Sequence, residues 1–288
     1  MKVSFIVIAY KSNDVLPALL QSIGAQTGSL EKQIIIIDNY SADNCARLVQ
    51  ESGLHASLTI NRENRGFTAA VNQALADATG DFVFLLNPDI RLHPDCTPKL
   101  TAVLTADPAV AAAAPQLLSP DGTIQSSVRN FPTLSTLIWE HTGLARLFPR
   151  SRVFGRWKNR YFDHNTRAQV AQPMASALLF RRETFARIGP WDEQFFIFFS
   201  DVDYCKRIAD SGSAIIFEPA AHAEHRLGGS TRNEGGWIIR DSHRGFYRYL
   251  CKHELLGHRR IFRPFVWLLL WISAQIRVYL RLILEATS

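Results

Sequence analysis

Short apolar segments rich in β-branched residues alternate with helix-like segments through the first third of the chain. The expected strands span residues 3–9, 34–37, 57–61 and 82–86, and the expected helices between them span residues 14–23, 41–52 and 68–78. The second strand is apolar at every position from Ile34 to Ile37, which is typical of a parallel strand covered by helices on both faces. This βαβαβαβ order predicts a doubly wound α/β sheet.

Polar residues follow each of these expected strands. They are Tyr10, Asp38 with Asn39, residues 61–66, and residues 87–89. Open α/β sheets bind ligands beyond the carboxyl ends of their strands, so we expect the binding site at this edge. The first strand continues into Tyr10-Lys11-Ser12-Asn13 instead of a GxGxxG sequence, which argues against a dinucleotide-dependent oxidoreductase.

The remainder of the chain is less regular. Further strands are expected at residues 175–181 and 214–217, helices at 183–188 and 202–211, and a helix followed by a strand at 102–114. Residues 130–172 carry many aromatic and arginine residues with little periodicity, and we expect an insertion or a mobile loop there. Residues 240–284 are helical in character. We therefore expect a ligand-binding domain over residues 1–235 and a C-terminal helical segment over 236–288.

Composition limits the class of protein. The 288 residues are enough for a substantial core, and 47% hydrophobic with 20% charged residues is typical of a globular chain. The net charge of +6 suits nucleic acid, anionic lipid or phosphorylated substrates, and charge alone does not choose among them. Four scattered cysteines without a CxxC pair, and an N-terminal apolar run that stops at Lys11 without a cleavage site, predict a cytoplasmic protein.

The C-terminal segment contains an almost uninterrupted apolar stretch from Pro264 to Ile276. About 13 residues separate Arg263 from Arg277, fewer than the ~20 that a membrane-spanning helix needs. Trp267, Trp271 and Tyr279 with flanking arginines suit a helix that lies on an anionic membrane surface. The alternative is a core helix that packs on the main domain.

Two acidic residues are candidates for chemistry. Asp89 closes an apolar strand within Asn87-Pro88-Asp89, where a carboxylate can bind a divalent cation that neutralises a diphosphate; the alternative is a simple turn. Asp201 follows a run of aromatic residues at the expected start of a helix. There it is either an N-cap or a base whose pKa is raised by partial desolvation.

Two histidines, His222 and His225, follow the strand at 214–217. They have no third ligand at a recognised zinc spacing. In an extended segment they point to opposite faces, so one of them is a better candidate ligand than both. A hydrolase built on a histidine-bound metal is therefore a weak alternative.

The order of these motifs resembles that of family 2 glycosyltransferases with the GT-A fold, particularly the bacterial rhamnosyltransferase-like branch that acts on cell-surface polysaccharides. The resemblance covers roughly residues 1–255. It is carried by residues 3–10, 34–39, 61–67 with Asn72, 86–89, 129–132, 181–185, 191–205, and 219–225 with Gly229-Ser230. It implies a GT-A-type doubly wound, mostly parallel sheet flanked by helices, with a C-terminal helical extension.

The resemblance also implies roles for individual residues. The expected nucleotide-binding residues are Ala9, Tyr10, Asp38, Asn64, Arg65, Gly66, Asn87 and Pro88, with Asp38 hydrogen-bonded to the base. Asp89 corresponds to the metal-binding carboxylate of the family's DxD element, in which Asn87 replaces the first aspartate. His225 corresponds to the histidine that completes the metal site, which leaves His222 as scaffolding.

Asp201 corresponds to the catalytic base of the family. Arg226 and Arg232 are expected to steady the leaving diphosphate, and Trp191, Asp192 and Glu193 to contact the acceptor. Two departures stand out. Ser200 replaces the glutamate that usually precedes the base, and Pro190-Trp191 replaces the usual Gly-Phe. Loss of the glutamate removes like-charge repulsion, so Asp201 is expected to be a somewhat weaker base than its counterparts.

The implied activity is metal-dependent, inverting transfer of a sugar from a nucleoside diphosphate to a saccharide or lipid-linked saccharide, in cell-surface polysaccharide or lipopolysaccharide synthesis. The branch implies dTDP-rhamnose as donor and Mg²⁺ or Mn²⁺ as cofactor. Nucleic acid is not an expected partner, and the implied location is the inner face of the cytoplasmic membrane. A non-catalytic subunit that binds nucleotide sugars or assembles at the membrane is the alternative that Ser200 and the basic tail leave open.

Overall fold

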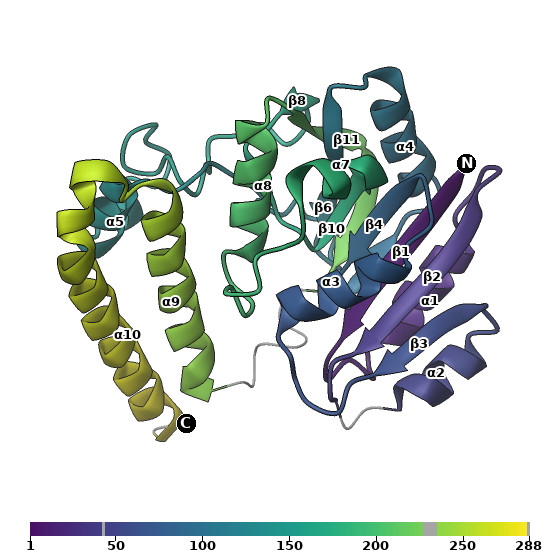
Figure 1. Cartoon of the computed structure of the whole chain (residues 1–288), viewed down its shortest axis with the longest axis horizontal. Helices are drawn as coiled ribbons and strands as arrows, with labels where there is room; N and C mark the ends of the chain where they lie inside the picture. The colour runs from purple at the N-terminus through teal and green to yellow at the C-terminus, as the bar shows by residue number, and fades with distance from the viewer. Residues whose placement is uncertain (42–43, 227–234, 287–288) are drawn as a thin grey trace.

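A computed structural model of the chain describes residues 1–41, 44–226 and 235–286. Figure 1 shows a mixed sheet with helices on both faces, and a hairpin of two long helices, α9 (Gly235–His253) and α10 (Arg263–Ala286), beside it. The predicted fold class, a mostly parallel sheet flanked by helices with a C-terminal helical extension, is confirmed.

The main sheet has the strand order β3-β2-β1-β4-β10-β6-β11-β5, with β8 paired to β11. Its strands are β1 (Lys2–Ala9), β2 (Glu31–Asp38), β3 (Ala56–Ile60), β4 (Phe82–Leu86), β5 (Ile90–Leu92), β6 (Val110–Leu118), β8 (Ala168–Gln169), β10 (Ala177–Arg181) and β11 (Ala214–His225). Strands β3, β2, β1 and β4 are parallel, and β10 is antiparallel to both of its neighbours. The carboxyl ends of β1 and β4 therefore meet at one edge, as the sequence predicts.

Helices cover both faces of this sheet. On one face Phe5 and Val7 pack with α1 (Leu16–Gly24), α2 (Cys45–Glu51) and α4 (Cys96–Ala106). On the other face Ile6 and Ile8 pack with α3 (Phe67–Asp77), α7 (Arg182–Ile188) and α8 (Ser200–Asp210). Successive residues of β1 thus lie in different cores, which explains why the strand is apolar at nearly every position.

The structure departs from the sequence expectation in the middle of the chain. Residues 130–172 form α5 (Leu134–His141), α6 (Leu144–Leu147) and one strand of a small ladder, in which β7 (Val128–Arg129) pairs with β9 (Gln172–Pro173). Trp157 stacks on Phe199 and Phe246, with ring centroids 6.0 and 5.5 Å apart. This insertion is therefore folded against the helices because its aromatic side chains join their core.

The strand predicted at 214–217 is also much longer, because β11 continues to His225 after a register shift between Glu218 and His222. This extension pairs with β6 and β5 and brings His225 opposite Ile90. The pairing satisfies backbone groups that a loop would leave exposed.

The C-terminal hairpin buries one stripe of α10. Val266, Leu270, Ala274 and Val278 recur every fourth residue and are each at most 7% exposed. The opposite side of α10 carries large exposed side chains, and a short 3₁₀ helix (Gly257–Phe262) precedes it. The expectation that this segment is too short to span a membrane is wrong by length and composition, since the continuous helical segment Gly257–Leu284 contains an 18-residue window with a mean hydropathy of 1.5.

Candidate active site

A cleft of about 460 Å³ opens at the carboxyl edge of β1 and β4, between the sheet and the helices α8 and α9. Asp89, Asp201 and His225, the three residues on which the sequence hypothesis depends, all line it. The remaining lining residues are Ile8, Tyr10, Asn39, Asn64, Phe67, Asn87, Pro88, Arg129, Trp157, Gln172, Met174, Ala175, Ser176, Ile197, Phe198, Phe199, Ser200, Val202, Trp237, Ile238 and Ser242.

Asp89 and His225 are brought together by strand pairing. Asp89 lies between β4 and β5, and β5 pairs with β11 so that Ile90 is opposite His225. The Oδ1 atom of Asp89 is 3.5 Å from Nε2 of His225, and the two side chains are only 8% and 4% exposed. A backbone bond of 3.0 Å from the Arg226 amide to the Asp89 carbonyl fixes this approach.

Gln125 determines how His225 presents its ring. Its Nε2 donates to the His225 carbonyl (2.7 Å), so its Oε1 is left to accept a hydrogen bond from Nδ1 of the same histidine (3.0 Å). With the proton on Nδ1, the lone pair of Nε2 faces the carboxylate of Asp89. The buried Oδ1 of Asp89 has no hydrogen-bond partner among the described residues.

Two facing acceptors of this kind can share a cation. A carboxylate and an imidazole are ligands that suit Mn²⁺, and Mg²⁺ commonly combines one or two carboxylates with waters and phosphate oxygens. Asp89 and His225 therefore fit a divalent cation that completes its coordination with a bound diphosphate. Within residues 1–41, 44–226 and 235–286, no group of three or more histidine, cysteine, aspartate or glutamate side chains could hold a metal.

Asp201 lies in the first turn of α8. The N-cap of this helix is Phe199, in a left-handed conformation with φ of 68°, so the alternative role of Asp201 as N-cap is wrong. Its Oδ2 accepts a hydrogen bond from Gln172 Nε2 (3.0 Å), and its Oδ1 accepts one from the Val202 amide (2.9 Å). Burial raises the pKa of the Asp201 carboxyl above its usual range, against the opposing effects of that amide and of the nearby Arg129 charge. These features suit a general base.

Tyr10, Asn39 and Asn64 also line the cleft. Asn39 donates to Oδ1 of Asn64 (3.0 Å) and to the carbonyl of Gly66 (3.1 Å), which holds the loop before α3. Gly66 has a φ of +83°, and a Cβ there would be 2.7 Å from the Phe196 ring. Gly66 thus allows this loop to pack against the segment before α8.

Several predicted nucleotide-binding residues lie near the cleft without lining it. Ala9, Arg65 and Gly66 are in this group, as is Asp38, which is 2% exposed. Oδ1 of Asp38 accepts hydrogen bonds from the amide and hydroxyl of Ser41, at 2.9 and 2.5 Å. The proposed contact between Asp38 and a nucleotide base stays a prediction.

The predicted acceptor residues are placed elsewhere. Trp191 is 2% exposed and stacks on Tyr204 with ring centroids 4.6 Å apart, so it is a core residue. Asp192 pairs with Lys252 (2.6 Å), and Glu193 accepts a hydrogen bond from Asn72 (2.9 Å). None of the three lines the cleft, because the aromatic core of α8 and the adjacent ion pairs hold them away from it.

The structure does not place the remaining predicted site residues in the cleft either. Arg226 is exposed and does not line the cleft, and Arg232 is outside the described residues. His222 packs its ring 5.5 Å from that of His93, away from His225, as expected for an extended strand. The two histidines therefore do not form one metal site.

The structure adds residues to which the sequence gave no role. Arg129 and Gln172 are register partners in the β7–β9 ladder, and this pairing brings both beside Asp201. Trp237, Ile238 and Ser242 come from α9, which lies in the predicted C-terminal segment. Each ladder strand has two residues, too short for a periodic signal, and only the 129–132 motif pointed to this region.

Comparison with known proteins identifies the class. The sequence profile described as glycosyl transferase family 2 matches residues 4–188, and the chain belongs to this family. It is thus a glycosyltransferase, and the resemblance inferred from the motifs is confirmed.

Relatives named as rhamnosyltransferases match most of the chain. N-acetylglucosaminyl-diphospho-decaprenol L-rhamnosyltransferase of Mycobacterium tuberculosis is 25% identical over 257 residues, which cover 85% of this chain and 83% of the relative. Rhamnosyltransferase WbbL of Escherichia coli K12 is 24% identical over 269 residues, covering 91% of this chain and 97% of the relative.

Solved structures agree in fold. The mannosyltransferase PcManGT from Pyrobaculum calidifontis, in complex with GDP-Man and Mn²⁺, superposes with a TM-score of 0.61 at 19% identity and covers 94% of this chain and 73% of its own. GalNAc-T7 with UDP, GalNAc and Mn²⁺ gives a TM-score of 0.60 at 14% identity, covering 81% of this chain and 44% of its own. This chain therefore spans less than half of GalNAc-T7, and the likeness concerns the fold.

Proposed function

We propose that this protein transfers a sugar from a nucleoside diphosphate to a saccharide hydroxyl with inversion at the anomeric carbon. The observation that carries the proposal is the presence, in one cleft, of the Asp89–His225 pair and of the half-buried Asp201 carboxylate. The first arrangement suits a cation-bound diphosphate, and the second suits a base that acts on an attacking hydroxyl.

The residues of the cleft have separate roles in the proposed reaction. Asp201 accepts the proton of the acceptor hydroxyl as its oxygen attacks the anomeric carbon from the side opposite the diphosphate. Asp89 and His225 would hold Mg²⁺ or Mn²⁺, which, when bound, neutralises negative charge on the leaving diphosphate. Arg129 places a further positive charge near Asp201. This charge opposes the effect of burial and favours the ionised carboxylate.

We further propose a rhamnosyl donor, dTDP-rhamnose, and a saccharide acceptor carried on a lipid diphosphate. The two relatives named as rhamnosyltransferases support the donor, and the mycobacterial one, named for a diphospho-decaprenol substrate, supports the acceptor. Such an enzyme would serve cell-surface polysaccharide or lipopolysaccharide synthesis.

A lipid-linked acceptor places the reaction at a membrane, and the proposed location is the cytoplasmic face. The exposed side of α10 supports a membrane surface as partner. Phe265, Trp267, Trp271, Ile276 and Tyr279 are each 49–67% exposed there. Arg259 and Arg260 in the preceding 3₁₀ helix supply positive charge suited to anionic lipid headgroups.

A ligand screen followed by a transfer assay tests the proposal. The unfolding temperature of the full chain would be measured with UDP-, GDP- and dTDP-sugars, each with and without Mg²⁺ or Mn²⁺, because a ligand at 100 times its Kd stabilises by about 2.7 kcal/mol. We expect the largest cation-dependent shift with dTDP-rhamnose, and transfer to a lipid-diphosphate saccharide. Binding without transfer to any acceptor would favour the non-catalytic subunit instead.

A further inference from the structure

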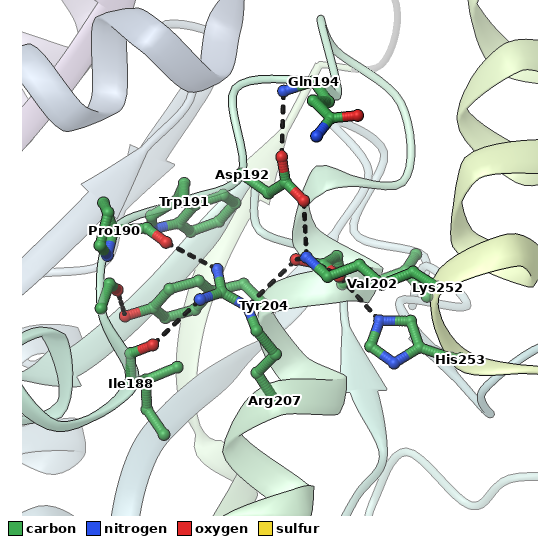
Figure 2. A network of polar contacts seen from close by, with 12 residues as sticks. Ile188, Pro190, Trp191, Asp192, Gln194, Val202, Tyr204, Arg207, Lys252 and His253 are labelled. Atoms are coloured by element: carbon green, nitrogen blue, oxygen red, sulfur yellow. Dashed lines mark hydrogen bonds and ion pairs between the residues drawn. The ribbon is translucent and has the colours of Figure 1, made fainter. Parts of the chain in front are cut away.

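Asp203 is a buried carboxylate next to the active site that glycosyl transfer does not use. Its side chain is 1% exposed, yet nitrogen atoms of three side chains reach it: Arg207 Nε (3.1 Å), Lys252 Nζ (2.9 Å) and His253 Nε2 (2.7 Å). In Figure 2, Lys252 and His253 of α9 reach this network from the side opposite to Tyr204 and Arg207 of α8. A buried charge of this kind is stable only when it is compensated.

The network joins three parts of the chain. Lys252 also binds Asp192 (2.6 Å), in the segment that leads to the cleft-lining residues Ile197 to Phe199. Arg207 donates to the carbonyls of Ile188 (3.0 Å) and Pro190 (2.8 Å) at the start of the same segment. The end of α9, helix α8 and this connecting segment are therefore fastened at one point (Figure 2).

A second attachment lies nearer the start of α9. Asp241 accepts a hydrogen bond from the Phe198 amide (3.2 Å), and a Cβ at Gly245 would be 2.4 Å from the Phe198 carbonyl oxygen. Trp237, Ile238 and Ser242 of the same helix line the cleft. Helix α9 thus forms one wall of the site and contacts Phe198, in the segment that precedes α8.

Asp201 and Asp203 are two positions apart on α8 and so point in different directions. Asp201 lines the cleft, whereas Asp203 faces α9. Any rotation or shift of α8 that moves Asp201 in the cleft must also move Asp203 against Lys252 and His253 of α9.

We propose that Lys252 and His253 are positioning residues, which hold Asp203 and thereby fix where α8 presents Asp201 to the acceptor hydroxyl. The C-terminal hairpin within residues 236–288 then supports catalysis, in addition to its proposed contact with the membrane. The inference rests on the proposed role of Asp201 as base.

The ionisation of Asp203 agrees with this arrangement. Burial alone would raise the pKa of the carboxyl, but hydrogen bonds from His253 and Lys252 and the charges of Lys252 and Arg207 outweigh it, and the net direction is downward. The carboxylate thus stays ionised and paired at neutral pH.

A comparison of Lys252→Met with Lys252→Arg in the full chain distinguishes a positioning role from a general effect on folding. Methionine keeps the length of the side chain without its charge, whereas arginine can still bridge Asp192 and Asp203. We expect Lys252→Met to lower kcat ~10–100-fold while the donor KM stays unchanged, because small misplacements of a catalytic group cost about that much. Lys252→Arg should recover most of the loss.

The double variant Asp203→Asn with Lys252→Met covers the case in which Lys252→Met fails to fold, because it removes the buried carboxylate together with the charge that compensates it. The same loss of kcat is expected. Arg47→Met is the matched control, since Arg47 forms an exposed ion pair with Glu51 on α2, and its kcat should equal that of wild type. A wild-type kcat in Lys252→Met and in the double variant would overturn the proposal.

Hydrogen exchange separates this inference from the proposed function. Amides of residues 198–204 should exchange faster in Lys252→Met than in wild type, whether or not the wild type transfers any sugar. Faster exchange in a chain without transferase activity would overturn the proposed function and leave only the structural link between Lys252 and α8. Unchanged exchange in Lys252→Met would overturn the positioning role, even in an active enzyme.

Discussion

Gln172 donates a hydrogen bond from Nε2 to Oδ2 of Asp201 over 3.0 Å. The same amide donates to the Pro173 carbonyl (3.0 Å), so both of its N–H groups are used. Its Oε1 is buried and has no partner within the described parts of the chain. Gln172 is 2% exposed and therefore fixed, and its amide favours the ionised form of the base.

The first prediction concerns the pH dependence of transfer. Burial raises the pKa of Asp201, and the base acts only when ionised, so the acidic limb of the kcat/KM profile should lie above the ~3.9 of an ordinary aspartate. Gln172→Met removes a donor to the carboxylate, raises the pKa of Asp201 further and should shift that limb to higher pH. The profile of Gln50→Met, at an exposed position on α2, should match wild type. A Gln172→Met limb at or below the wild-type pH would contradict the assignment.

The second prediction removes the base itself. Asp201→Asn keeps the size of the side chain and its ability to accept hydrogen bonds, so the fold and the affinity for a nucleoside diphosphate should stay intact. Turnover should fall ~10²–10⁴-fold, the usual contribution of general base catalysis. Calorimetric titration with nucleotide and a transfer assay on the same preparation make the comparison. Wild-type turnover in Asp201→Asn would show that another group takes the proton.

Much of the sheet could be predicted from the sequence, because strands such as Ile34–Ile37 are apolar on both faces and carry a strong local signal. Asp89, Asp201 and His225 could be found for another reason, since their motifs occur in a recognisable order. The positions of some other motif residues could not be predicted in this way. Trp191 belongs to such a motif, yet its ring is buried on Tyr204.

The rest of the site depends on contacts between residues far apart in sequence. Gln125 reaches His225 only because β11 continues past its register shift, and Gln172 reaches Asp201 through a ladder of two-residue strands. Neither contact has a period or a local composition that marks it. Similarly, α9 lines the cleft because of the way the helices pack, although the composition of the sequence suggested that a separate segment begins near residue 235.

The third prediction tests the cation pair through its support. In Gln125→Met, Nδ1 of His225 loses its acceptor, so the ring is no longer held with Nε2 toward Asp89. The affinity for Mn²⁺, titrated in the presence of a nucleoside diphosphate, should fall about 10–100-fold, as is usual when such a support is lost. His222→Gln serves as the control, because His222 packs on His93, away from Asp89 and His225, and should leave the affinity unchanged. Weaker binding in the control alone would assign the cation to His222.

The fourth prediction concerns α10. The rings of Trp267 and Trp271 stack 6.1 Å apart, and the two residues are 50% and 49% exposed on α10. Their combined transfer into a lipid interface should contribute on the order of 2 kcal/mol, so Trp267→Ser with Trp271→Ser should weaken binding to vesicles containing anionic lipid by about 30-fold. Co-sedimentation of the full chain with such vesicles measures the change.

The arginines near the start of α10 add a salt-dependent part to the same interaction. Binding to anionic vesicles should weaken as ionic strength rises, whereas vesicles of neutral lipid should show weaker binding with little salt dependence. Ile60→Ser is the matched control, since Ile60 is 58% exposed on β3, in the sheet and away from the hairpin, and should bind like wild type. If the tryptophan variant bound vesicles as well as wild type but lost a concentration-dependent dimer in sedimentation, a second copy of the chain would cover this face. The membrane assignment of α10 would then be wrong, although the transferase assignment, which rests on the cleft, would stand.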